Sequence, residues 1–331
     1  MPTRQERFRG CLLAGAIGDM AGAVVEAESP EYIAATFRSV DDILAVESVP
    51  EFSGPAWAAG RFTDDTQMSM CVAEWLLDDD SHSAELLLAK FATAYEPWRR
   101  YGPGTAAILQ MFARHQADWR QLSTAMLPEG SYGNGSAMRA APIGLAYSDN
   151  LKKAVAVAIE SSRPTHSHSL GYQGAVLQSI AVAAAMRSGE FAVDEFLETL
   201  RQSLVHFSDL QQDTSPFTRA IAAIESGLRR EASCAEMALT LGTGISAIEA
   251  VPMAIYCFLR HPHSYADVIH NAIFIGGDTD TIAGMAGAIS GASLGADAIP
   301  RHWISAIQDA IYPAMTIEAI ADRLAAKFPR N

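Results

Sequence analysis

The spacing of apolar residues predicts helices along almost the whole chain. Apolar side chains recur at three- and four-residue intervals, as on helices that bury one face. The segments with this spacing are rich in Ala and Leu: Ala84–Tyr95, Thr105–His115, Leu151–Ser161, Leu170–Arg187, Val193–Phe207, Pro216–Arg229, Ser246–Arg260, Tyr265–Ile273 and Trp303–Ile311. Short breaks separate them, and the alternating β-branched runs typical of strands are nearly absent. We therefore expect an all-α protein.

The chain shows no sign of division into separate domains. Its 331 residues could form one large domain or two average ones. No Pro- or Ser-rich linker interrupts the sequence, and no internal repeat of solenoid length is present. We expect a single compact multi-helix domain over residues 1–331.

Two of the expected helices are unusually rich in glycine. The positions are Gly15, Gly18 and Gly22 in the first helix, and Gly284, Gly287 and Gly291 in the second. Glycine weakens an isolated helix by about 1 kcal/mol relative to alanine. Its recurrence at three- and four-residue spacing favours faces against which another helix packs closely.

Two similar acidic clusters lie far apart in the sequence, each directly before a long apolar run. The first contains Thr63, Asp64 and Asp65, and the second contains Asp278, Asp280 and Thr281. Such residues are common helix caps. Their oxygen atoms are also ligands suited to Mg²⁺ or Mn²⁺. If the fold brings the clusters together, the four carboxylates would need protons or cations to neutralise them. A site for two divalent metals is the natural solution. The two interpretations are compatible.

Three further segments carry candidate functional residues. Glu26, at the expected end of the first helix, is either a surface acid or a group that activates water. Two glycines flank Asn134 in the segment Ser131–Arg139, which suits an anion-binding loop or a plain turn. Thr165–His168 holds two histidines without the further ligands of a zinc site, which favours ligand contacts or helix capping.

Composition limits the classes of partner and compartment. The chain is 49% apolar and 19% charged, and its net charge of −14 argues against nucleic acid or an anionic membrane as the main partner. Four cysteines show neither CxxC spacing nor a disulfide pattern, which favours the cytoplasm. The uncharged run Ile282–Ala296 is too short to span a bilayer. In the absence of a sustained heptad pattern, we expect a monomer.

Taken together, these motifs resemble the ADP-ribosylglycohydrolase family, which includes the dinitrogenase reductase-activating glycohydrolase. The similar stretches, in the family's order, are Gly15–Glu26, Arg61–Met68, Tyr132–Gly144, Thr165–His168, Glu249–Pro252 and Gly276–Gly291. Each stretch alone is only weak evidence for the family. The ordered combination of TDDT, GNGSAMR and GGDTDT is highly specific, and the stretches span nearly the whole chain.

The resemblance implies an all-α fold with a binuclear site, usually for two Mg²⁺ or Mn²⁺ ions. The implied metal ligands are Thr63, Asp64, Asp65, Asp278, Asp280 and Thr281. Glu26 matches an active-site glutamate, and Asp65 could share its catalytic role. Residues implied to bind substrate are Ser131, Tyr132, Gly133, Asn134 and His166. The implied activity is metal-dependent hydrolysis at ribose C1″ of an ADP-ribosylated protein or a related ADP-ribose compound, with release of ADP-ribose.

One departure concerns the linkage that is cleaved. Arginine-specific bacterial members carry a catalytic Asp shortly after a Trp-Arg and Gly-Thr stretch. The comparable stretch here is Trp98–Leu109, and no carboxylate follows until Asp118, which argues against arginine specificity. Two alternatives stay open: a metal-dependent phosphoesterase acting on ADP-ribose or nucleotides, and a non-catalytic, crystallin-like or binding protein.

Overall fold

The expected helices account for most of the structure. The computed structural model describes residues 1–49, 57–58, 60–115, 118–124, 126–187, 191–209 and 212–329. The α-helices of these ranges are α1 (Arg4–Gly22), α2 (Pro30–Thr36), α3 (Val40–Leu44), α4 (Asp64–Asp78), α5 (Ala84–Ala94), α6 (Pro103–His115), α7 (Trp119–Leu122), α8 (Ala141–Ala146), α9 (Leu151–Ser162), α10 (Ser169–Ala185), α11 (Val193–Asp209), α12 (Ser215–Arg229), α13 (Cys234–Leu241), α14 (Ala247–Arg260), α15 (Tyr265–Phe274), α16 (Thr279–Leu294), α17 (Arg301–Ser305) and α18 (Ala314–Lys327). The fold is all-α, as the sequence predicts.

Short 3₁₀ helices and one small hairpin complete the described structure. The 3₁₀ helices are η1 (Pro97–Arg99), η2 (Asn134–Ser136) and η3 (Ala296–Ala298). Strands β1 (Ser48–Val49) and β2 (Trp57–Ala58) pair antiparallel, with Ser48 opposite Ala58 and Val49 opposite Trp57. Both strands are two residues long, which fits the scarcity of strand patterns in the sequence.

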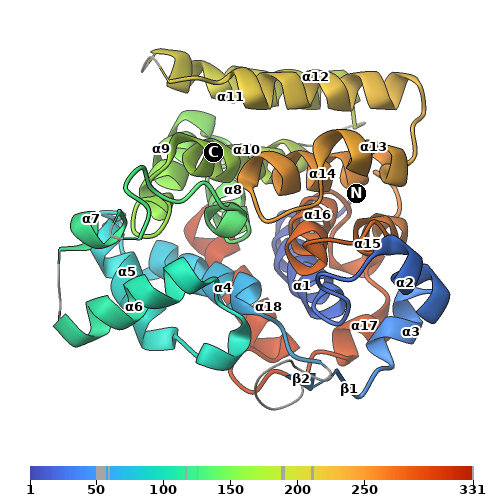
Figure 1. The fold of residues 1–331 in the computed structure, drawn as a ribbon, viewed down its shortest axis with the longest axis horizontal. Helices are drawn as coiled ribbons and strands as arrows, with labels where there is room; N and C mark the ends of the chain where they lie inside the picture. Colours follow the sequence, from blue (N-terminus) through green and yellow to red (C-terminus); the bar gives the residue numbers. More distant parts are fainter. Residues whose placement is uncertain are drawn as a thin grey trace.

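Helices α1 and α16 lie side by side at the centre of the molecule (Figure 1). A Cβ atom at Gly18 would lie 2.2 Å from the carbonyl oxygen of Ala283, and one at Gly291 would lie 2.1 Å from that of Gly10. No side chain fits at such distances, so the two backbones touch directly. The glycine spacing therefore has the packing role that the sequence predicts. Because Gly22 meets Thr279 while Gly10 meets Gly291, the helices run antiparallel.

The other helices surround this central pair. Helices α4, α8, α10, α14, α15 and α18 contact α1, α16 or both. Helices α11 and α12 form an outer layer that packs on α10 and α14 (Figure 1). The buried apolar residues of these elements belong to one continuous core. Within the described part of the chain, no helix combines the length and apolar character needed to cross a bilayer.

One expected helix ends earlier than the sequence predicts, and five of the described helices were not predicted. The expected helix Trp303–Ile311 ends at Ser305 as α17. The buried Asp309 carboxylate accepts the backbone N–H groups of Ile311 and Tyr312, and its other oxygen pairs with Arg99, 2.8 Å away. These bonds hold the segment in a non-helical turn. Helices α2, α3, α7, α13 and α18 were not predicted.

The first helix also ends earlier than expected. It stops at Gly22, and turns carry the chain on to Glu26. Because the chain leaves the helical path before Glu26, the Glu26 side chain can reach the start of α16.

We predict that substitution of the touching glycines destabilises the fold. Gly18→Ala should lower the free energy of unfolding by about 1–3 kcal/mol, because the methyl group collides with backbone that cannot move aside. Gly15→Ala is the matched control on the same helix, since its Cβ would meet Ala288 at an ordinary 3.4 Å. Urea unfolding followed by circular dichroism measures both. Equal midpoints for the two variants would contradict the close-packing argument.

Candidate active site and metal centre

The start of α4 is fixed by a buried carboxylate from α1. Thr63 caps the helix, since its hydroxyl oxygen accepts the N–H of Asp65 at 3.3 Å. That hydroxyl donates to Asp19 Oδ1 at 2.9 Å, and the Thr63 N–H donates to the same oxygen at 2.9 Å. Asp19 Oδ2 accepts the N–H and hydroxyl of Thr66 at 2.9 and 2.6 Å. The first acidic cluster is thereby held rigidly, and capping is confirmed for Thr63.

Asp19 is a functional residue that the sequence motifs did not reveal. Its side chain is buried, and the four hydrogen bonds above come from the N-terminal turn of α4, where backbone N–H groups favour an anion. The signal available in the sequence was a lone carboxylate between Gly18 and Gly22, on a helix that is otherwise apolar there. Such an acid is buried only when the fold supplies donors to it.

A glycine turn places the second cluster. Gly276 and Gly277 have φ values of 70° and 82°, which glycine adopts without strain. The turn ends where the Asp278 N–H donates to the carbonyl of Thr243 at 2.8 Å. Asp278 occupies the N-cap position of α16 but makes no side-chain capping bond. Its Oδ2 instead accepts a hydrogen bond from the Asn134 side chain. The capping interpretation is therefore wrong for Asp278. Its side chain faces the loop of residues 131–135, called the glycine-rich loop below.

The glycine-rich loop is anchored to the segment before α14. The Asn134 N–H donates to the carbonyl of Ile245 at 3.0 Å, and the Tyr132 carbonyl accepts the N–H of Ala247 at 3.0 Å. Within the loop, the Ser131 hydroxyl accepts the N–H of Gly133 at 3.2 Å. These bonds determine where the loop stands relative to Asp278.

Backbone hydrogen bonds bring the Glu26 segment against the same turn. The Ala27 N–H donates to the carbonyl of Gly277 at 2.9 Å, and the Gly277 N–H donates to that of Glu28 at 3.3 Å. Ala27 itself has a left-handed φ of 64°. Glu26 is thus placed beside the start of α16 by its neighbours' backbone.

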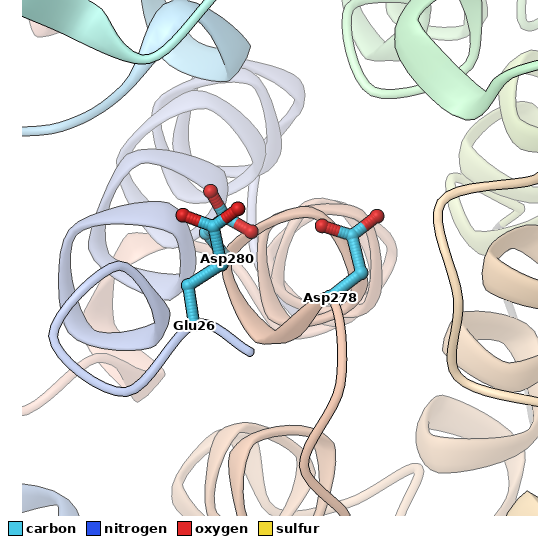
Figure 2. Close-up of side chains that lie close together, drawn as sticks. All are labelled: Glu26, Asp278 and Asp280. Atoms are coloured by element: carbon cyan, nitrogen blue, oxygen red, sulfur yellow. The ribbon is translucent and has the colours of Figure 1, made fainter. Parts of the chain in front are cut away.

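Glu26, Asp278 and Asp280 form a group with the geometry of a metal site. One carboxylate oxygen from each lies within 4.8 Å of the others. Figure 2 shows the three carboxylates pointing to the same side of the start of α16. Asp64 and Asp65 are not members of this group, but they line the same cavity. The fold thus brings the two acidic clusters together, and Glu26 lies among the expected ligands.

The cavity has a volume of about 340 Å³, within the range of small-molecule sites. Its lining includes Glu26, Asp64, Asp65, Ser131, Gly133, Asn134, His166, Asp278, Asp280 and Thr281. Two of the expected site residues are not in the lining. Thr63 is buried beneath it, and Tyr132 is 53% exposed with its ring edge-to-face with His168. Tyr132 could contribute to the site only from its margin or through its backbone.

The donor set fits a divalent cation that prefers oxygen ligands. Asp65 Oδ2 is buried and has no hydrogen-bond partner in the structure, and such an atom is costly unless a cation or proton meets it. Burial raises the pKa values of Asp64, Asp65 and Asp280 well above the ordinary value of an aspartate. The charge of Asp19 raises the pKa of Asp64 and Asp65 further. A bound metal would neutralise this excess negative charge.

His166 presents a neutral imidazole to the cavity. Burial lowers its pKa to about 3, and the nearby Arg139 charge acts in the same direction. The Thr165 hydroxyl accepts a hydrogen bond from Arg139 at 2.8 Å and lies 2.8 Å from His166 Nδ1. Since arginine can only donate, the hydroxyl hydrogen is free to point at Nδ1. This arrangement favours a proton on Nε2, which can donate to a ligand. His168, by contrast, caps α10.

The fold and site together define an all-α protein with a carboxylate-rich, metal-ligating cavity. The family model for ADP-ribosylglycohydrolases matches residues 1–331. ADP-ribosylhydrolase ARH3 of Bos taurus is 35% identical over 326 residues, covering 90% of this chain and 87% of its own. The Mus musculus ARH3 is 36% identical over 90% of this chain and 86% of its own. The chain belongs to the ADP-ribosylglycohydrolase family, a class of enzymes that hydrolyse a glycosidic bond.

Other similarities extend over nearly the whole chain. An uncharacterized protein of Archaeoglobus fulgidus is 31% identical over 92% of each chain. A solved structure described as an ADP-ribosylglycohydrolase-related protein complex superimposes with a TM-score of 0.67. It covers 98% of this chain and 99% of its own at 23% identity, which shows a shared fold.

We predict an unusual pH dependence of stability for the metal-free protein. Because Asp280 has a raised pKa in the folded state, the folded chain binds more protons than the unfolded chain above pH 3.8. The contribution of Asp280 to the free energy of unfolding therefore falls as pH rises from 5 to 7. Asp280→Asn should gain stability relative to the unmodified chain over this interval, measured by urea unfolding in EDTA.

Asp322→Asn is the control for this experiment. Arg9 lowers the pKa of Asp322 through a hydrogen-bonded ion pair. This carboxylate is therefore ionised in both states from pH 5 to 7, and its loss should change stability equally at both values. If Asp280→Asn showed the same pH-independent difference, the crowded-carboxylate interpretation of the site would be wrong.

Proposed function

We propose that this protein hydrolyses the bond at ribose C1″ of an ADP-ribosylated protein or related ADP-ribose compound and releases ADP-ribose. The observation that supports this most is the gathering of five carboxylates, from Glu26 and both acidic clusters, around one cavity that also contains the glycine-rich loop. Membership of the ADP-ribosylglycohydrolase family supplies the reaction class. We also propose that residues 1–331 form a single domain.

The proposed cofactors are two Mg²⁺ or Mn²⁺ ions. We assign their ligands to Thr63, Asp64, Asp65, Asp278, Asp280 and Thr281. Bound there, the ions would fix the ribose hydroxyls and lower the pKa of a water molecule. Because the Thr63 hydroxyl donates its hydrogen to Asp19, its oxygen can contribute only a lone pair to a metal. The Asn134 bond holds Asp278 in place.

The remaining site residues have roles in proton transfer and substrate binding. Glu26 and Asp65 are the proposed catalytic carboxylates, which position the attacking water and accept its proton. Hydrolysis at C1″ proceeds through an oxocarbenium-like state, which adjacent carboxylates stabilise. Gly133, Asn134 and Ser131 would bind the diphosphate, with Tyr132 contributing from the margin, and His166 would donate through Nε2.

Of the candidate substrates, ADP-ribosyl-arginine fits the lining of the cavity least well. A substrate guanidinium would call for a carboxylate on the α6 side of the cavity. The α6 residues that line it include Gly104, Thr105 and Ile108, and the helix contains no Asp or Glu. We therefore favour an oxygen-linked ADP-ribose, such as the O-glycosidic bond to serine or the ester of O-acetyl-ADP-ribose, as the substrate class.

We further propose a monomer acting in the cytoplasm, without nucleic acid or membrane as its partner. Cys11, Cys71, Cys234 and Cys257 are all buried and not joined in disulfides, as is usual in a reducing compartment. The net charge of −14 disfavours polyanionic partners.

The substrate test compares three compounds in parallel: an ADP-ribosyl-arginine protein, an ADP-ribosyl-serine peptide and O-acetyl-ADP-ribose. Each is incubated with Mg²⁺, with Mn²⁺ and with EDTA, and the products are separated by chromatography. We expect metal-dependent release of ADP-ribose from an oxygen-linked substrate. Formation of AMP or phosphate instead would indicate a phosphoesterase, and no turnover of any substrate would favour a binding protein.

Asp64→Asn tests the role of the acidic cavity in this reaction. We expect kcat to fall by about 100-fold or more, because metal binding and charge stabilisation are both lost. Asp322→Asn, in the partly exposed ion pair with Arg9 and outside the cavity lining, should retain full activity. Circular dichroism should show the same helical content in both variants. Unchanged turnover in Asp64→Asn would refute the metal-dependent mechanism.

A further inference from the structure

Arg100 makes a direct ion pair with Glu26 beside the acidic cavity. One of its guanidinium nitrogens donates to Glu26 Oε2 at 3.0 Å and to the carbonyl of Ala23 at 2.7 Å. The guanidinium also lies 4.4 Å from the ring centroid of Trp57. The side chains of Arg100 and Glu26 are 21% and 32% exposed, so water screens their attraction only in part.

The charge environment makes this pair unusual. Arg100 is the only arginine or lysine among the described residues that line the cavity, where it stands with five carboxylates. Its charge lies next to the position where a divalent cation would meet Glu26, Asp278 and Asp280. A cation bound at Asp278 and Asp280 would therefore lie near a fixed positive charge that already holds the adjacent Glu26 carboxylate.

The backbone directs Arg100 toward this position. Arg100 follows η1 with φ 60° and ψ 30°, a left-handed conformation that is unfavourable for an L-residue with a side chain. The preceding Arg99 is buried and bonded to the Phe62 carbonyl and Asp309, which fixes the segment. The strained residue thus lies at the end of a rigid element and reaches across to the C-terminal end of α1.

We infer that Arg100 is a positioning residue that holds Glu26 in the metal-free site and competes with the metal for its carboxylate. In the absence of metal, the ion pair offsets part of the repulsion between Glu26 and the two aspartates. A bound divalent cation would share the Glu26 carboxylate with the Arg100 guanidinium, and the like charge of Arg100 would weaken the affinity of the site for the metal. The catalytic part of this inference rests on the proposed function, whereas the metal-binding part does not.

Arg100→Gly removes the guanidinium and suits the left-handed backbone, so it should fold. Calorimetric titration with Mn²⁺ should show binding at least about threefold tighter than in the unmodified chain, because a like charge a few ångströms away is gone. The Mn²⁺ concentration for half-maximal ADP-ribose release should fall in parallel. Arg100→Lys keeps the charge and should stay near the original affinity.

Arg9→Ala is the matched control. It breaks a carboxylate ion pair of similar exposure, with Asp322, at the other end of α1, and should leave Mn²⁺ affinity unchanged. If Arg100→Gly does not fold, Arg100→Asn serves instead, since asparagine tolerates a left-handed backbone.

Three outcomes would overturn the inference: unchanged Mn²⁺ affinity in Arg100→Gly, weaker affinity in this variant, or equal tightening in Arg100→Lys. Weaker affinity together with a lower melting temperature would identify Arg100 as a purely structural residue. If the unmodified chain released no ADP-ribose from any substrate, the proposed function would fail, and the Mn²⁺ titration would still decide the role of Arg100.

Discussion

The direct backbone contact between α1 and α16 is the constraint on which the site depends. Because the helices run antiparallel and touch at Gly10, Gly18 and Gly22, the end of α1 is fixed against the start of α16. Glu26 follows the first helix, and Asp280 lies in the first turn of the second. A bulkier residue at these glycines would separate the helices and with them the carboxylates, so packing and site geometry have the same origin.

This packing places several carboxylates close together, and different interactions offset their mutual repulsion. Asp19 is stabilised by the hydrogen-bond donors at the start of α4. Glu26 is paired with Arg100, and Asp278 accepts a hydrogen bond from Asn134. Asp65 retains a buried oxygen without a partner. Burial raises the pKa values of Asp64, Asp65 and Asp280 well above their ordinary range. These three carboxylates face the cavity, where a metal would complete the charge balance.

The site is assembled from turns held on rigid helices. Backbone hydrogen bonds join the Glu26 segment to the glycine turn before Asp278, and they tie both that turn and the Asn134 loop to residues 243–247. Positive φ angles at Gly276, Gly277 and Ala27 make these turns possible. Such irregular segments can present side chains and N–H groups to one cavity, while the helices beneath them provide the rigidity that preorganised chemistry requires.

The sequence by itself determined the helical class, the close packing at the glycines and the residue types of the site, because these follow from local spacing and side-chain chemistry. It could not place Asp19, whose role depends on donors 44 and 47 residues away. It could not show that Thr63 caps its helix whereas Asp278 faces the glycine-rich loop, since both residues directly precede a helix. The early end of α17 and the pairing of Arg100 with Glu26 likewise depend on contacts between distant segments. Only the tertiary structure decides these, because a side chain's partners and burial are set by which helices pack together.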